Sequence, residues 1–218
     1  MRTIKGPGIF LSQFIGGQHP FNTLDGLAGW AAEKGYKALQ IPCNHKAIFD
    51  VELAAESQTY CDEISGKLAQ HGLVVSELST HLEGQLIAVN PAYDEAFDNF
   101  APQAVRGNAT ARQAWATDIV KKAAVASARL GLTAHATFSG SLAWPWMYPW
   151  PPHNEARFQE AFSELARRWR PILDAFDEQG VNVCYEIHPG EDLHDGVTFE
   201  RFLQLLDNHP RCNILYDP

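Results

Sequence analysis

The sequence has no long apolar run and only four cysteines among its 218 residues. No stretch approaches the roughly 18 apolar residues of a membrane-spanning helix, so we expect no membrane partner. The N-terminal residues lack the apolar segment of a secretory signal peptide. The cysteines show no paired spacing, which predicts buried free thiols in a reducing compartment and a cytoplasmic location.

Positive charge is scarce as well. There are 17 Lys and Arg against 26 Asp and Glu, which gives a net charge of −9 at pH 7. A nucleic-acid surface needs a basic patch or stripe. The densest basic group, Arg167, Arg168 and Arg170, shares its segment with Glu160 and Glu164. We therefore expect a solvated helix face there and no nucleic-acid partner.

Short apolar segments alternate with longer segments of helical periodicity along the chain. Strands are expected at 9–15, 37–41, 73–81, 132–138, 181–187 and 213–216. Helices are expected at 24–34, 51–70, 109–130, 154–179 and 198–207, the last two capped by Asn154 and Thr198. Because strands and helices alternate, the pattern predicts an α/β fold with a parallel sheet and helical crossovers.

Two α/β architectures fit this pattern, an open doubly wound sheet and a (β/α)8 TIM barrel. No Gly-x-Gly-x-x-Gly motif follows the first strand, as a dinucleotide-binding sheet would require. Polar residues instead follow several different strands, which favours a barrel: His45, His81, Glu83, His135, Ser139, Glu186, His188 and Asp217. Barrels typically need about 250 residues. We therefore expect one barrel domain over 1–218, incomplete, with about six of its eight β/α units.

Two carboxylates, Glu186 and Asp217, each close one of the last two expected strands. Side chains alternate along a strand, so Glu186 lies opposite the apolar Val183 and Tyr185, which face the helices. The same alternation places Asp217 on the interior side of its own strand. Carboxylates at the ends of neighbouring parallel strands are suited to holding one divalent cation.

Two motifs stand at the ends of the last two expected strands: Glu186-Ile187-His188-Pro189 with Glu191, and Tyr216-Asp217-Pro218. In these motifs the sequence resembles the sugar isomerase/epimerase family with the xylose-isomerase-like barrel. A third segment supports the resemblance, His81-Leu82-Glu83-Gly84-Gln85. The resemblance implies that Glu186 binds a divalent metal and exchanges the substrate proton, while Asp217 is a metal ligand only. A histidine and a second glutamate from two following strands would complete the site beyond Pro218.

The resemblance also implies a cofactor and a reaction. Mn²⁺ is the expected metal, with Mg²⁺, Co²⁺ or Zn²⁺ as alternatives. The expected reaction is isomerisation or epimerisation of a sugar or keto-sugar, by proton abstraction beside a carbonyl through a metal-stabilised enediolate. A lyase or dehydratase acting on a keto-cyclitol or an oxidised glycoside is the first alternative, and a non-catalytic sugar-binding protein is another. The acidic charge disfavours the related endonucleases.

Six further residues are expected at the substrate: His81, His135, Trp144, Trp146, His188 and Glu191. Each has a structural alternative, because strand histidines are often satisfied core residues and loop carboxylates are often solvated. The two tryptophans belong to a Pro/Trp segment at 140–153 that is suited to stacking on a sugar ring or shielding it from water. A self-packed loop, or a contact within a homo-oligomer, is the alternative for that segment.

Overall fold

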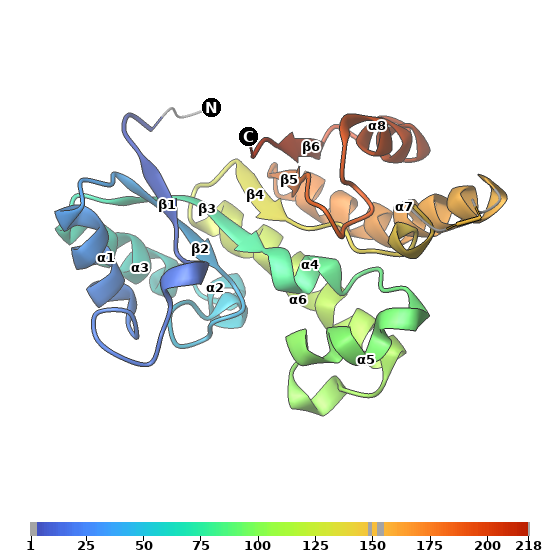
Figure 1. The fold of residues 1–218 in the computed structure, drawn as a ribbon. Helices are drawn as coiled ribbons and strands as arrows, with labels where there is room; N and C mark the ends of the chain where they lie inside the picture. The colour runs from blue at the N-terminus through green and yellow to red at the C-terminus, as the bar shows by residue number, and fades with distance from the viewer. Residues whose placement is uncertain (1–3, 148–149, 152–154, 218) are drawn as a thin grey trace.

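The structure is a computed structural model of the chain and describes residues 4–147, 150–151 and 155–217. Its strands form a single six-stranded sheet in chain order, and every neighbouring pair is parallel (Figure 1). The strands are β1 (Gly8–Phe10), β2 (Ala38–Pro42), β3 (Val74–Thr80), β4 (Ala134–Thr137), β5 (Asn182–Glu186) and β6 (Cys212–Leu215). The order does not reverse, so the predicted parallel α/β fold is confirmed, as an open sheet consistent with an incomplete barrel.

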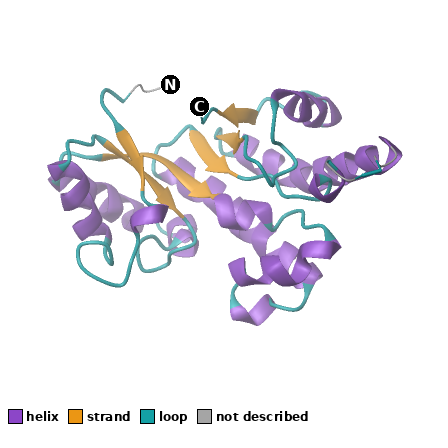
Figure 2. Ribbon diagram, viewed as in Figure 1, coloured by secondary structure: helices purple, strands orange, loops and turns teal. Residues whose placement is uncertain are grey.

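Helices follow the strands and cover the sheet from outside (Figure 2). They are α1 (Leu24–Glu33), α2 (Val51–Glu56), α3 (Gln58–Gln70), α4 (His81–Gln85), α5 (Asp94–Phe97), α6 (Ala109–Arg129), α7 (Glu155–Glu178) and α8 (Gly196–Leu205). Short 3₁₀ turns are η1 (Ser12–Phe14), η2 (Pro91–Tyr93), η3 (Asp98–Phe100), η4 (Gln103–Val105) and η5 (Trp144–Trp146). No helix within the described ranges is long and apolar enough to cross a membrane.

Two expected elements end or break earlier than predicted. The first strand stops at Phe10, because 12–14 turn into η1. The helix expected over 51–70 is two helices, since Ser57 has an extended backbone and its side chain accepts a hydrogen bond from the Tyr60 amide, which begins α3.

The start of α8 also differs from the prediction. Asp195, not Thr198, is the N-cap, and its carboxylate accepts a hydrogen bond from the Thr198 amide at 2.8 Å. The Thr198 hydroxyl contacts the Asp195 backbone in return, which completes a capping box. The expected cap of the preceding helix, Asn154, lies outside the described residues.

The two faces of β5 differ as the alternation predicts. Val183 and Tyr185 are fully buried against the helices, whereas Glu186 on the opposite face is half-buried. The Tyr185 ring meets Trp169 of α7 and Phe202 of α8 edge-on, with ring centroids 4.9 and 5.4 Å away. These buried aromatic rings fix the strand's orientation and so decide which way Glu186 points.

Candidate functional site

A cavity of about 350 Å³ lies at the carboxyl ends of the strands. Its lining includes Phe10, Ser79, His81, Phe138, Glu186 and Asp217. Both predicted carboxylates therefore border one space, although they come from different strands. The strands bring them there because the carboxyl ends of parallel strands share one edge of the sheet.

Glu186 is paired with His81 inside this cavity. Nε2 of His81 lies 3.0 Å from Oε2 of Glu186, and little of either side chain is exposed. The close contact with His81 holds the pKa of Glu186 below its usual range, against the opposing effect of burial, and charge on His81 and His188 adds to the lowering. Glu186 is therefore an ionised carboxylate at neutral pH, in a position fixed by a neighbour.

A row of rings crosses the strand ends beside Glu186. The His81 ring lies 5.1 Å from Phe10 and 4.6 Å from Phe138, and Phe138 lies 4.9 Å from His188. Sequence reasoning missed Phe10 and Phe138. Their position at or just after a strand end was the available signal. This apolar wall limits the water that reaches one side of the carboxylate.

Three polar atoms of the cavity residues are buried without a hydrogen-bond partner within the described part of the chain: Oγ of Ser79 and both ring nitrogens of His81. Nε2 of His81 makes the 3.0 Å contact with Glu186, which leaves Ser79 Oγ and His81 Nδ1 for a ligand. Buried polar atoms are ordinarily paired, so an unpaired one in a cavity wall is suited to binding a polar molecule there.

His135 lies elsewhere, and its expected place in the pocket is not supported. The side chain is 0% exposed, its Nε2 is 2.8 Å from Thr80 Oγ1, and its ring packs 5.2 Å from Phe176 of α7. Burial lowers the pKa of His135 to about 3, so the ring stays neutral. It is a satisfied core histidine on the helix-facing side of β4.

Glu191 also turns away from the cavity and binds the segment that follows β4. Its Oε2 accepts a hydrogen bond from the Gly140 amide at 2.6 Å. Burial raises its pKa to about 7. The adjacent Asp192 accepts three backbone hydrogen bonds from the same segment, from Leu142, Ala143 and Trp144 at 2.8–2.9 Å. The two carboxyl groups thus position this loop.

The remaining predicted substrate residues are outside the cavity lining or at its margin. His188 is exposed, with Nδ1 2.6 Å from the Pro189 carbonyl oxygen, and reaches the site through Phe138. Trp144 packs against His194 and Trp146 against the core and Arg157, so neither lines the cavity. Part of the Pro/Trp segment, 148–149 and 152–153, lies outside the described residues.

The donors present fit part of a metal site. Carboxylate oxygens of Glu186 and Asp217 suit a hard divalent cation, and both border the cavity. Within 4–147, 150–151 and 155–217, no group of three or more His, Cys, Asp or Glu is placed to hold a metal ion. The described residues therefore offer at most a partial set of ligands.

A family model described as "Xylose isomerase-like TIM barrel" matches residues 28–218. No curated protein sequence matches the chain.

Several solved structures share the fold. A putative xylose isomerase from Rhodospirillum rubrum is 15% identical with a TM-score of 0.62, and the match covers 96% of this chain and 64% of that one. The probable 3-DHS dehydratase AsbF from Bacillus anthracis is 15% identical with a TM-score of 0.58, covering 94% and 60%. An L-ribulose 3-epimerase is 15% identical with a TM-score of 0.56, covering 97% and 59%. The chain thus spans about three fifths of the length of these relatives.

Proposed function

The chain belongs to the xylose isomerase-like TIM barrel family, and from that premise we propose that it carries the proton-transfer half of a metal-dependent sugar isomerase or epimerase. Glu186 is the proposed general base. The observation that carries the proposal is the ionised Glu186 carboxylate, held by His81 in a cavity at the carboxyl ends of the strands.

The proposed step is removal of the proton from the carbon beside a sugar carbonyl. A Glu186 oxygen takes that proton, the C–H electron pair becomes the enediolate double bond, and the carbonyl oxygen becomes negatively charged. Return of the proton to the neighbouring carbon, while the hydroxyl proton passes from one enediolate oxygen to the other, gives isomerisation. Its return to the same carbon from the opposite face, from a second acid, gives epimerisation. Positioned bases contribute about 10²–10⁴-fold in rate.

Glu186 and Asp217 are the residues that would hold the divalent metal, with Mn²⁺ proposed first and Mg²⁺, Co²⁺ or Zn²⁺ as alternatives. When bound, the metal supplies electrostatic stabilisation for the negative charge that develops on the substrate oxygen. The protein's own part is to fix the two carboxylates on adjacent strands. His81 contributes by keeping Glu186 in one orientation. Ser79 Oγ and His81 Nδ1 are the proposed partners for sugar hydroxyls.

The experiment is solvent-deuterium incorporation into a panel of ketoses, measured by NMR with and without added Mn²⁺, for the protein that carries this chain. Glu186→Gln keeps the shape but cannot accept a proton, so exchange is expected to fall at least about 10²-fold. Asp217→Asn is expected to act on the metal requirement, with partial rescue by excess Mn²⁺. The matched control is Glu178→Gln, an exposed carboxylate at the end of α7.

Different outcomes separate the reaction types. Exchange with a new sugar as product indicates isomerisation or epimerisation. Loss of water from the substrate, detected by mass spectrometry, would replace the proposal with a dehydratase using the same base. Exchange at the wild-type rate in Glu186→Gln contradicts the role of this residue as base.

A further inference from the structure

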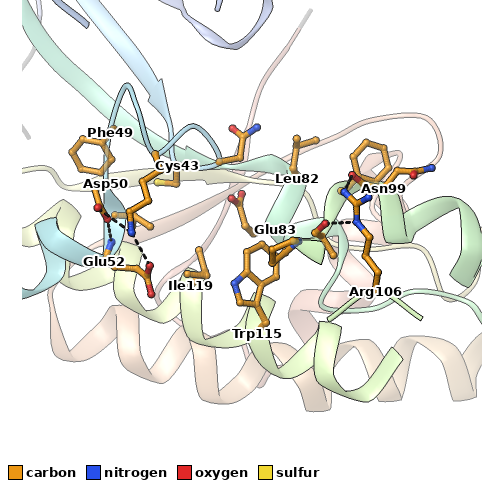
Figure 3. A pocket seen from close by; sticks show the side chains of 16 residues that line it. Cys43, Phe49, Asp50, Glu52, Leu82, Glu83, Asn99, Arg106, Trp115 and Ile119 are labelled. Atoms are coloured by element: carbon orange, nitrogen blue, oxygen red, sulfur yellow. Dashed lines mark hydrogen bonds and ion pairs between the residues drawn. The ribbon is translucent and has the colours of Figure 1, made fainter. Parts of the chain in front are cut away.

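A second cavity, of about 480 Å³, lies beside the first and is not used by the proposed proton transfer. Its volume falls in the range of about 300–1,000 Å³ that is usual for small-ligand sites. It lies between the segment after β2, helix α4, the 99–106 segment and the first half of α6, where Trp115 is located (Figure 3). The residues that matter for the argument are Asn44, Leu82, Glu83, Asn99 and Trp115.

Glu83 is the unusual member of this lining. The residue is only 2% exposed, and its Oε2 has no hydrogen-bond partner within the described part of the chain. Figure 3 shows its carboxyl group between Leu82 and Trp115, directed into the cavity. Leaving a buried polar atom unpaired is unfavourable, so a ligand that offers a hydroxyl group there is favoured.

The charges around the opening are already satisfied. Lys46 lies 3.2 Å from Asp50 and 3.4 Å from Glu52. The Arg106 guanidinium donates to the backbone oxygens of Ala101 and Asn99. No cationic group of the lining is therefore arranged as a fork for a phosphate, and the buried Glu83 disfavours an anion. The preferred ligand is neutral.

The rest of the lining combines flat rings with amide groups. Trp115 and the exposed Phe100 supply aromatic surface, and Asn44 and Asn99 supply donors and acceptors. A sugar ring has an apolar face of C–H groups and an equatorial belt of hydroxyl groups, so it matches a wall that offers both.

The two cavities touch. Asn44 and Leu82 line both of them, and Leu82 directly follows His81, which contacts Glu186 in the first cavity. We propose that the cavity at Glu83 binds the second, neutral ring of a glycoside whose first ring lies at Glu186. This inference rests on the proposed function, and it names the substrate class as two-ring glycosides rather than free monosaccharides.

The test is equilibrium binding by isothermal titration calorimetry to the chain as printed. The probes are cellobiose, maltose, lactose and sucrose, with glucose and fructose as single-ring references. At least one disaccharide is expected to bind about tenfold more tightly than either monosaccharide. Glu83→Leu removes the polar group, and Trp115→Phe keeps a packed ring but shrinks the stacking surface. Both are expected to reduce the disaccharide affinity to the monosaccharide level and to leave monosaccharide binding unchanged.

The controls are Glu178→Gln and Trp146→Phe, which alter a carboxylate and an indole that do not line either cavity. Equal affinity for one and two rings overturns the proposal, and so does a disaccharide preference that survives in both cavity variants. If free ketoses exchange deuterium but no disaccharide binds more tightly than a monosaccharide, the proposed function is supported and the second-ring site is contradicted. If a disaccharide preference depends on Glu83 but Glu186 supports no exchange, the second-ring site is supported and the proposed function is contradicted.

Discussion

Among single residues, His81 has the largest expected influence on the chemistry because it contacts the proposed base. Its contact with Glu186 at 3.0 Å is the main reason why the pKa of this carboxyl lies below the usual range. His81→Gln is therefore expected to raise the pKa of Glu186 and to move the acid limb of the pH–exchange profile to higher pH. The measurement is deuterium exchange between pH 4 and 8.

The control for this variant is His71→Gln, since His71 pairs with Asp25 at 2.9 Å, away from the cavity lining. An acid limb that stays in place in His81→Gln would show that the contact does not set the protonation of Glu186.

Glu83 predicts a pH dependence of stability. Burial raises its pKa from 4.5 to about 7, so the folded chain binds a proton that the unfolded chain has released. The free energy of unfolding is therefore expected to fall as the pH rises from about 4.5 to 7, and then to level off. At about 1.4 kcal/mol per pH unit, this one group lowers the free energy of unfolding by roughly 3 kcal/mol over that range.

Glu83→Gln is expected to remove this contribution, measured as urea unfolding at pH 5 and pH 8. Glu191 and Asp192 have pKa values raised to about 7 by burial, so part of the slope remains in the variant. The exposed Glu178→Gln is expected to keep the full slope. A variant slope equal to that of the wild type would contradict the buried, protonated state of Glu83.

The sequence predicted some site residues and not others for a physical reason. Glu186 was placed correctly because its strand has an apolar face, Val183 and Tyr185, opposite the carboxylate. β4 has no such contrast, since His135 alternates with small alanines, so its sequence does not say which way the ring turns. Packing against α6 and α7 decides that the His135 ring faces the helices.

Among the elements, β2 to β6 were predicted best, to within two residues at each end, whereas β1 ends at Phe10 and not at residue 15. The helix breaks were predicted least well. The division at Ser57 depends on a side-chain hydrogen bond to the Tyr60 amide, which competes with helix continuation and leaves no trace in the apolar spacing. Thr198 was expected to cap this helix, but the contact with Asp195 identifies the earlier residue as the N-cap.

The capping box of α8 supports a prediction at this scale. Asp195→Ala removes the acceptor for the Thr198 amide and is expected to lower the free energy of unfolding by about 1 kcal/mol. Glu200→Ala, an exposed position on the same helix, is expected to change it by less than about 0.5 kcal/mol. The measurement is urea unfolding, and equal effects of the two substitutions would contradict the structural role of the box.

In the whole molecule, both cavities lie at the carboxyl ends of the strands, and the sheet is open with β1 and β6 at its edges. The sequence could predict the parallel sheet from the alternation of elements, and the polar residues after several strands predicted a site at the strand ends. It could not predict the second cavity, because that space depends on how the 99–106 segment packs between α6 and the segment after β2, and no periodicity encodes such a contact.

Exposed apolar side chains at β6, an edge strand among the described residues, predict association between copies of the chain as printed. Ile214 is 45% exposed and Tyr216 is 80% exposed on the side of β6 where β5 is covered by helices. Apolar side chains on an unpaired edge strand favour pairing with another chain. Sedimentation velocity is expected to show concentration-dependent association, and the double variant Ile214→Lys, Tyr216→Lys is expected to reduce it.

The control is Val197→Lys, which alters a 69% exposed apolar residue on α8, away from the edge, and is expected to leave the association unchanged. If the edge variant sediments like the wild type, then β6 does not mediate association.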